Sequence, residues 1–241
     1  KQTIKFSKSA TNNFETKAKS QIGEKLYNAF IKGYTFKQWG KNPKELPASI
    51  FNRLPLRFDY NESYFKNALV QGIPKDGYTK IFERLVDSPY IDIIYNYNYE
   101  YDNDHEVKYL TIYTGPLDKL LNNKFGKLDW RSLKFKKQII NCEDFQGTSV
   151  INFPEKKYKF TRIHEPRHLH VERNYGKKTL IMKEFPTVDN NEPYYPINDI
   201  QNRSRHKKYK DFLNQDNKKL VFGGRLADYA YYDMDMTISA A

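Results

Sequence analysis

The amino-acid sequence predicts an α/β fold of the mixed α+β kind. Three observations support this class. A helical repeat of apolar residues occupies positions 12–33, short strand-like segments fill positions 128–185, and strand–helix pieces flank that stretch on both sides. Because the flanking pieces alternate strand and helix, we expect them to form one α/β domain that an antiparallel sheet interrupts.

The N-terminal helix is indicated by apolar residues that recur every four positions, which places them on one helix face. These residues are Phe14, Ala18, Ile22, Leu26 and Phe30. Asn12 and Glu15 resemble a capping pair, and Gly33 is a typical helix end. We therefore predict a helix over 12–33, followed by an aromatic loop over 34–43.

Breaker residues and periodicity place the elements in the middle of the chain. Pro47 is expected to open a short helix that ends before Pro55, and apolar spacing predicts a helix at 81–86. The run at 91–95 predicts a buried strand. Tyrosines that alternate with polar residues over 95–101 predict an exposed strand.

The second half of the chain reads mainly as strands. One is expected at 107–113, and five more follow in LKFKKQII, SVINF, YKFTRIH, HLHVERNY and TLIMKEF. Their shortness and the lack of helical period indicate an antiparallel sheet. A basic helix at 199–214, a strand at 220–222 and a helix from Met234 complete the prediction.

Charge and composition restrict the classes of function. The net charge is +12 and aromatic residues make up 16% of the chain, which favours an anionic partner such as a nucleic acid or a phosphorylated small molecule. Cys142 is the one cysteine, which fits a reducing compartment. The basic run from Arg203 to Lys210 is more typical of a solvated helix face than of a nucleic-acid site.

The segment His164-Glu165-Pro166-Arg167-His168 has the H-E-x-x-H pattern of zinc proteases. That pattern works on a helix, which puts both histidines on one face. Pro166 disfavours a helix interior by about 3 kcal/mol, and the flanking residues alternate as in strands. We therefore interpret the segment as a polar strand edge and expect no metal site.

Several positions suit phosphate binding without proving it. Arg53, Arg57 and Arg162 can each hold a phosphate through two parallel hydrogen bonds, and each can equally form a surface ion pair. Gly223-Gly224-Arg225 follows a predicted strand. Its glycines would let the backbone approach an anion, although an ordinary turn has the same composition.

Nine segments, in order along the chain, resemble the middle and C-terminal parts of bacterial UDP-galactopyranose mutases. They are Tyr34-Thr35 with Lys37-Gln38-Trp39-Gly40, Arg53-Leu54-Pro55-Leu56-Arg57-Phe58, Asn61 with Tyr64-Phe65, Gln71-Gly72-Ile73-Pro74 with Gly77-Tyr78-Thr79-Lys80, Tyr113-Thr114-Gly115-Pro116-Leu117-Asp118, Trp130-Arg131-Ser132-Leu133, Phe160-Thr161-Arg162-Ile163, Pro193-Tyr194-Tyr195-Pro196-Ile197, and Gly224-Arg225-Leu226 with Tyr231-Tyr232-Asp233-Met234-Asp235. No single segment is specific, but nine collinear segments are.

The resemblance implies an isomerase that interconverts UDP-galactopyranose and UDP-galactofuranose through a covalent adduct of the sugar with reduced FAD. It also implies part of a Rossmann-like FAD-binding domain, with an inserted helical domain and an antiparallel sheet domain. The glycine-rich dinucleotide-binding motif of the family's N-terminus is missing from this sequence. We therefore expect a fragment that holds FAD poorly and is inactive by itself.

The resemblance also implies site residues. Catalytic roles fall on Arg53, which moves onto the diphosphate, and on Arg162, which holds the diphosphate and supports the reduced flavin. The substrate-binding positions are Phe30 and Tyr34 at the uracil, Trp39 near the sugar on or beside a mobile loop, Asn152 near the nucleotide, and Tyr64, Tyr195 and Tyr231 at the diphosphate. The FAD-binding positions are Gly224, Arg225, Asp233, Met234, Asp235, Met236, Thr237 and Ile238.

The same resemblance implies a domain division. Residues 1–69 would form a helical substrate-binding domain with a mobile loop, residues 119–195 the sheet domain, and residues 70–118 and 196–241 the FAD-binding domain. We expect a cytoplasmic homodimer that binds UDP-galactose and UDP-galactofuranose, with no nucleic acid and no membrane insertion. A nucleic-acid-binding module with a basic, aromatic surface and a related flavin-dependent oxidoreductase stay open as alternatives.

Overall fold

The computed structural model describes most of the chain in two compact units. The described residues are 12–53, 56, 60, 69–101, 109–188, 192–215 and 219–241, with backbone alone at 52 and 53. The first unit comprises Lys1–Thr35, Asn42–Tyr97 and Phe135–Glu184, and the second comprises Phe36–Lys41, Asn98–Lys134 and Phe185–Ala241. This division describes packing, and the domain boundaries inferred from the resemblance stay predictions.

Helix α1 (Phe14–Leu26) opens the described chain with a reciprocal cap. The Asn13 side chain accepts a hydrogen bond from the backbone N–H of Thr16 at 3.0 Å, and the Thr16 hydroxyl oxygen accepts one from the backbone N–H of Asn13 at 3.3 Å. The cap therefore lies one residue after the predicted Asn12. The side chain of Phe14 then meets Phe51 edge to face, with ring centroids 5.5 Å apart.

The helical region does not end at Gly33, as the sequence predicted. Gly23, with φ +80°, kinks α1, a π-helical turn follows at Tyr27–Ile31, and α2 (Lys32–Trp39) continues to Gly40. A Cβ at Gly33 would overlap the carbonyl oxygen of Pro154. Gly33 is thus a position of close backbone approach, and the predicted loop over 34–43 is helical as far as Trp39.

The remaining helices of the first unit are short. The 3₁₀ turn Ala48–Arg53 confirms the short helix predicted between Pro47 and Pro55, and another 3₁₀ turn, Pro43–Glu45, precedes it. Helix α3 (Tyr78–Val86) confirms the helix expected at 81–86. The predicted strand at 91–95 is wrong. Residues 91–95 are exposed and form no strand, because an apolar run alone does not supply a pairing partner.

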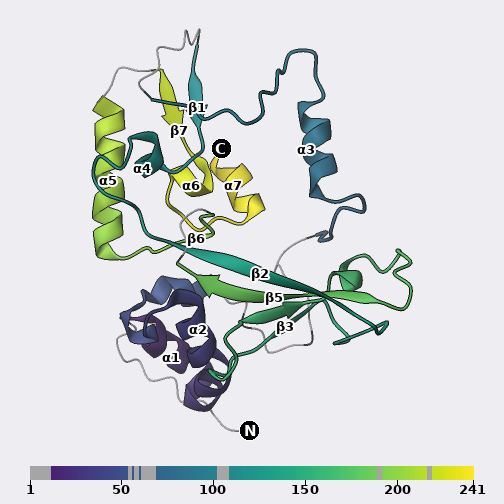
Figure 1. The fold of residues 1–241 in the computed structure, drawn as a ribbon. Coiled ribbons are helices and arrows are strands. Elements are labelled where there is room, and N and C mark those ends of the chain that lie inside the picture. Colours follow the sequence, from purple (N-terminus) through teal and green to yellow (C-terminus); the bar gives the residue numbers. More distant parts are fainter. Residues whose placement is uncertain are drawn as a thin grey trace. The chain divides into compact units, whose positions relative to one another are not determined.

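The sheet has the order β3-β4-β5-β2-β6 (Figure 1). Its strands are β2 (Trp130–Ile140), β3 (Val150–Asn152), β4 (Arg162–His164), β5 (Thr179–Thr187) and β6 (Tyr195–Pro196). The pairs β3–β4, β4–β5 and β2–β6 are antiparallel, as predicted. The predicted strand HLHVERNY is instead a 3₁₀ helix (Pro166–Leu169) followed by turns, because Pro166 opens a helical turn readily.

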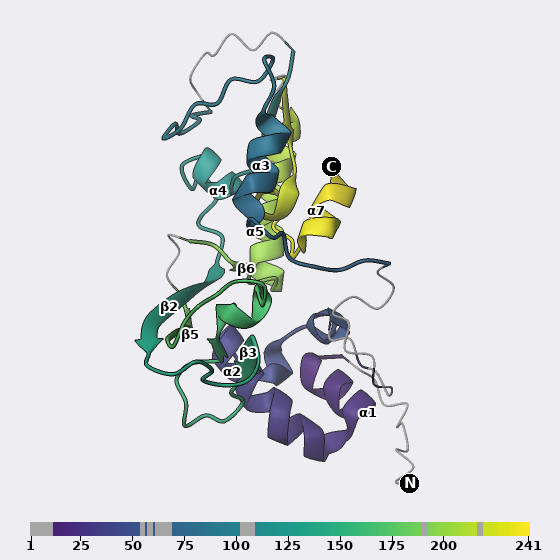
Figure 2. The same cartoon turned by 90° about the vertical axis from the view of Figure 1, so that its right-hand side faces the viewer.

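Within its described residues, the second unit contains a parallel pair of strands with helices between and after them. Strand β1 (Thr111–Tyr113) pairs with β7 (Leu220–Phe222), and Figures 1 and 2 show α5 (Ile200–Gln215) alongside α4 (Leu117–Leu120). Short α6 (Gly224–Ala227) and α7 (Met234–Ala240) follow β7. The basic helix, the strand at 220–222 and the helix from Met234 are therefore confirmed.

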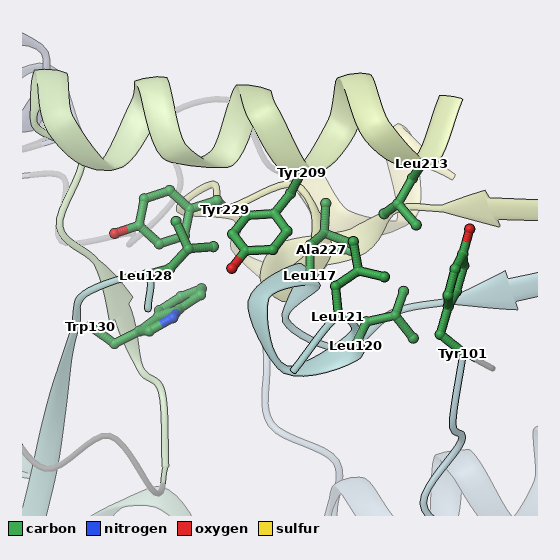
Figure 3. Close-up of a cluster of buried hydrophobic side chains, with 10 residues drawn as sticks. All are labelled: Tyr101, Leu117, Leu120, Leu121, Leu128, Trp130, Tyr209, Leu213, Ala227 and Tyr229. Atoms are coloured by element: carbon green, nitrogen blue, oxygen red, sulfur yellow. The ribbon is translucent and has the colours of Figure 1, made fainter. Parts of the chain in front are cut away.

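Aromatic residues, leucines and one alanine form the core of the second unit (Figure 3). They are Tyr101, Leu117, Leu120, Leu121, Leu128, Trp130, Tyr209, Leu213, Ala227 and Tyr229. The hydroxyl of fully buried Tyr209 accepts from the backbone N–H of Phe125 at 3.0 Å and donates to the carbonyl of Gly126 at 2.9 Å. These bonds satisfy the one polar group that Tyr209 brings into the core. Within the described residues, no helix has the length and apolar character that crossing a bilayer requires.

Candidate functional site

Three of the residues that the sequence marked for nucleotide binding meet in the first unit. Arg162, at the start of β4, is the register partner of Asn152 on β3, and its Nε donates to the Asn152 Oδ1 at 3.1 Å. The guanidinium carbon lies 5.5 Å from the ring centroid of Tyr34, a cation–π distance. These residues and Glu184 make up what we call the Arg162 cluster.

Glu184, which the sequence reasoning did not single out, lies behind Arg162. Its side chain is 2% exposed and its Oε2 lies 3.6 Å from the Arg162 Nη1 and 3.0 Å from the His164 Nε2. The Thr161 hydroxyl donates to the other carboxylate oxygen at 2.8 Å. Burial alone would raise the pKa of Glu184, but the hydrogen bond from His164, the charge of Arg162 and the Thr161 hydroxyl hold that pKa below its usual value.

The geometry of the Arg162 cluster suits anion binding. An ionised carboxylate on one side and an amide oxygen on another fix the plane of the guanidinium, and the Arg162 side chain is still 34% exposed. Phe30, on the π-helical turn four residues before Tyr34, is 60% exposed. The period-two pattern of β4 puts Arg162 and His164 on one face, but it does not show that Glu184 on β5 lies beside them.

A second set of predicted residues meets in the second unit. The rings of Tyr195 and Tyr231 stack with centroids 5.1 Å apart at an interplanar angle of 16°, and the Trp39 ring lies 6.3 Å from Tyr195. The guanidinium carbon of Arg225 lies 4.3 Å from the centroid of Tyr231. We call Trp39, Tyr195, Tyr231 and Arg225 the aromatic stack.

Arg225 is anchored by backbone carbonyls as well as by rings. Its Nη1 donates to the carbonyl of Tyr232, and its Nε and Nη2 donate to the carbonyl of Tyr194. Five donors on one planar fork allow this residue to tie β6 to the segment after α6. Its predicted contact with FAD stays a prediction, and its observed contacts hold the two tyrosines of the stack together.

The carboxyl ends of β1 and β7 offer a glycine-rich edge. The backbone N–H of Gly223 donates to the carbonyl of Tyr113 at 3.2 Å, so Thr114-Gly115 and Gly223-Gly224 leave the two parallel strands side by side. Gly224 has φ +83°, which favours glycine, and a Cβ there would meet Thr114 at 3.9 Å. In open parallel sheets, ligands bind beyond this strand end, so the residues fit the pyrophosphate part of a dinucleotide.

Comparison with known proteins decides the family. The family model for UDP-galactopyranose mutase matches residues 29–231. The chain belongs to this family. It is 38% identical over 230 residues to a probable UDP-galactopyranose mutase of Klebsiella pneumoniae and 35% identical over 236 residues to a dTDP-fucopyranose mutase of Escherichia coli. Each alignment covers 95% of this chain.

Both relatives are longer than this chain, which spans 59% of the Klebsiella protein and 62% of the Escherichia protein. A crystal structure of a reduced UDP-galactopyranose mutase shares the fold, with a TM-score of 0.67 at 16% identity. That match covers 91% of this chain and 64% of the solved one. The mixed α/β class predicted from the sequence is therefore confirmed.

Some predicted site residues of this family member lie outside the two clusters. Tyr64 lies outside the described residues, and Arg53 ends the 3₁₀ turn with only its backbone described. Asp233 is the N-cap of α7, and Met234, Met236 and Ile238 on that helix are exposed. Asp233, Met234, Asp235, Met236, Thr237 and Ile238 follow the range matched by the family model, so their role stays a prediction.

The His-Glu-Pro-Arg-His segment forms no zinc-protease helix. His164 ends β4 and contacts Glu184, whereas His168 lies on the 3₁₀ turn with its Nε2 3.2 Å from Asp144 Oδ1. Ligand atoms of Asp144, Glu165 and His168 lie within 4.8 Å of one another. However, fully buried Glu165 accepts the backbone N–H groups of Phe145 and Gln146, so these carboxylates anchor the adjoining loop.

Proposed function

We propose that the protein works as a UDP-galactopyranose mutase, an isomerase that interconverts UDP-galactopyranose and UDP-galactofuranose with reduced FAD. The observation that carries the proposal is the Arg162 cluster. In this chain, the oriented and accessible guanidinium of Arg162 lies next to Tyr34 and Asn152. The resemblance assigns all three positions to nucleotide binding. The comparisons support neither the nucleic-acid-binding module nor the flavin oxidoreductase.

Arg162 would hold the diphosphate of the substrate. A guanidinium and phosphate oxygens form two parallel charge-assisted hydrogen bonds, which are stronger than neutral ones. Glu184 and Asn152 orient the guanidinium before the substrate arrives, so little entropy is lost on binding. Arg162 therefore retains the diphosphate both while it is part of the substrate and after it becomes the leaving group.

The aromatic residues supply apolar contact area and hydroxyl donors. Phe30 and Tyr34 lie four residues apart on consecutive helical turns, so they share a face on which a uracil ring can stack. The hydroxyls of Tyr195 and Tyr231 add hydrogen-bond donors without adding charge. Trp39, packed on Tyr195, offers a rigid wall to the sugar.

FAD is part of the proposal because the family relationship and the glycine-rich edge both fit it. Gly224 and its neighbours at the carboxyl ends of β1 and β7 would hold the pyrophosphate. When bound and reduced, the flavin supplies the nucleophile for the anomeric carbon of the sugar. The positive charge of Arg162 would stabilise the negative charge of the departing diphosphate and would support the reduced flavin. A homodimer and a cytoplasmic location stay predictions.

The decisive experiment compares Arg162→Met and Arg162→Lys with the parent in the full-length reduced flavoprotein. We expect Arg162→Met to lower kcat/KM at least 100-fold and to weaken UDP binding by calorimetry. Arg162→Lys keeps the charge but loses the fork, so its loss should be intermediate. Arg173→Met, an exposed arginine of the same unit, is the matched control. Full turnover in Arg162→Met would refute the role of Arg162.

The identity to a dTDP-fucopyranose mutase supports a second candidate substrate, dTDP-fucopyranose. The two substrates differ in the base, the 2′-hydroxyl and the sugar, so competition separates them. We expect UDP to displace a fluorescent UDP analogue at lower concentration than dTDP does. Tighter displacement by dTDP, together with turnover of dTDP-fucopyranose, would favour the second candidate.

A further inference from the structure

Arg131 is a buried cation whose contacts the proposed function has not used. It is the second residue of β2 and is 6% exposed. Its Nε donates to the carbonyl of Gln38 at 2.8 Å and its Nη2 to the carbonyl of Lys37 at 3.2 Å. Among the described residues, no carboxylate forms an ion pair with it. Its partners are the carbonyls that the last turn of α2 leaves without helical hydrogen bonds.

Gly40 provides the space that this cap needs. It has φ +64°, the left-handed conformation that ends a helix, and a Cβ there would lie 3.1 Å from the Arg131 Nη1. An L-residue at this position would strain the backbone and crowd the guanidinium at the same time. The end of α2 and the Arg131 side chain therefore fit each other as one unit.

The backbone of Arg131 holds the other partner of Trp39. Arg131 and Tyr195 are register partners in the β2–β6 pair, and the Arg131 carbonyl accepts the backbone N–H of Tyr194 at 3.0 Å. One residue thus fixes β6 with its main chain and the end of α2 with its side chain. Trp39 and Tyr195, which these two elements carry, are the rings that meet at 6.3 Å.

A second contact, at Lys41, holds the segment that follows α2. The Lys41 ammonium donates to Asp199 Oδ2 at 2.8 Å, but both side chains are about one third exposed. Exposed ion pairs contribute little to stability, whereas the hydrogen bonds of Arg131 are shielded from water. We therefore treat Arg131 as the principal anchor of Trp39.

We propose that Arg131 is a positioning residue, which sets the Trp39 ring against Tyr195 and so shapes the wall that the sugar meets. The positioning itself stands on the contacts above, and its consequence for the substrate rests on the proposed function. Loss of the guanidinium should release the end of α2 and increase the mobility of Trp39. Binding of the sugar part should then weaken, while binding of the nucleotide part changes little.

The first measurement reads Trp39 without any ligand. The chain has two tryptophans, so Trp130→Phe leaves Trp39 as the only one. In that background we expect Arg131→Met to raise the acrylamide quenching constant of Trp39 at least twofold, with partial rescue in Arg131→Lys. Arg205→Met is the matched control, because Arg205 in the same unit also donates to a backbone carbonyl, that of Lys127.

Gly40→Ala tests the contact between Arg131 and the end of α2 from the helix side. It also provides the test of the positioning role if Arg131→Met does not fold. It leaves the guanidinium in the chain but displaces it, so Trp39 should again become more accessible to the quencher. Unchanged quenching in whichever of these variants folds would overturn the proposal. Quenching that rises equally in Arg205→Met would also overturn it, because the effect would then be general loosening.

The second measurement separates this proposal from the proposed function. In the full-length reduced flavoprotein, Arg131→Lys should raise KM for UDP-galactopyranose about tenfold while the Kd for UDP changes less than threefold. If the parent neither turned over this sugar nor bound UDP, the proposed function would fail, and the quenching result would still decide the positioning role. If UDP and the sugar nucleotide weakened equally, Arg131 would not act through the sugar wall.

Discussion

At the scale of single residues, the Glu184 carboxylate shows how a buried charge is made useful. Burial penalises its ionised form, and the contacts of His164, Arg162 and Thr161 reverse that penalty and lower its pKa. Removing one partner from such a buried network lowers the free energy of unfolding more than removing one partner of a surface ion pair, because the remaining polar atoms stay buried. The orientation of Arg162 therefore depends on a residue that contacts no ligand in the proposed mechanism.

We predict that Glu184→Gln changes the dependence of stability on pH. Because the folded-state pKa of Glu184 is below its ordinary value of 4.5, its contribution is full above that pH and is lost as the pH falls through the lowered pKa. The variant should lose about 1–3 kcal/mol of unfolding free energy at pH 7, and less at pH 3. Urea unfolding from pH 3 to 7 measures this difference.

The exposed Glu143→Gln serves as the control for that series. Several other carboxylates also have lowered pKa values, so only the difference between variant and parent isolates Glu184. A constant difference across the whole pH range would contradict the predicted linkage.

Gly33 gives a second prediction at this scale. A Cβ there would collide with the carbonyl oxygen of Pro154, which is backbone and cannot move aside cheaply. We expect Gly33→Ala to destabilise the protein by about 1–3 kcal/mol, even though alanine has a higher helix propensity than glycine. Gly72→Ala is the control in the same unit, because its Cβ would meet nothing within 4 Å. Chemical denaturation of the two variants compares them, and a stabilised Gly33→Ala would contradict the close approach.

At the scale of elements, the sequence predicted what depends on local periodicity. The amphipathic start of α1, the short helix before Pro55, helix α5 and strand β7 are all confirmed. The errors arise where a distant contact decides the outcome. Gly33 was interpreted as a helix end because its partner Pro154 lies 121 positions further along the chain. The run at 91–95 was interpreted as a buried strand, but it has no partner in the described residues.

The candidate site follows the same rule. Arg162, Asn152, Tyr195 and Tyr231 were marked by resemblance to motifs, and the structure brings them into two clusters. Glu184 and Arg131 were not assigned a role, because their importance comes from pairing across strands that are far apart in sequence. Register is a tertiary property, and single-sequence reasoning does not supply it.

Helix α5 gives a prediction on pH at the same scale. His206 contacts the carbonyl of Ala227 at 2.7 Å, and burial lowers its pKa below the ordinary 6.5. The folded state therefore prefers neutral histidine, so the stability that it provides is full above pH 6.5 and is lost as the pH falls through the lowered pKa. The hydrogen bond to the Ala227 carbonyl opposes this lowering of the pKa, Lys210 adds to it, and Asp228 and Asp118 oppose it more weakly.

We expect the unfolding free energy of His206→Gln to vary less between pH 5 and 7 than that of the parent. Glutamine keeps a donor for the Ala227 carbonyl but does not titrate. His170→Gln, in the other unit, is the control. Thermal unfolding followed by circular dichroism across this range makes the comparison, and parallel curves for variant and parent would exclude His206 as the source.

At the scale of the whole molecule, the net charge of +12 can attract anions even where the protein has no nucleic-acid-binding site. The basic run on α5 is partly engaged within the fold. Arg203 donates to the carbonyl of Asn198, and Arg205 donates to that of Lys127. A diffuse positive field nevertheless attracts small anions, because attraction over a distance depends on the summed charge rather than on a designed groove.

We therefore predict that the association rate of UDP with the full-length reduced flavoprotein falls as salt rises. Screening shortens the reach of the field from about 30 Å at 10 mM ionic strength to about 8 Å at 150 mM, so the rate should drop several-fold over that interval. The dissociation rate should change less, because the bonds that we propose between UDP and Arg162 are short-range. Stopped-flow tryptophan fluorescence measures both rates, and uridine, which carries no phosphate, is the control ligand. An association rate for UDP that depends on salt no more than that of uridine would show that the charge of the protein does not guide UDP to it.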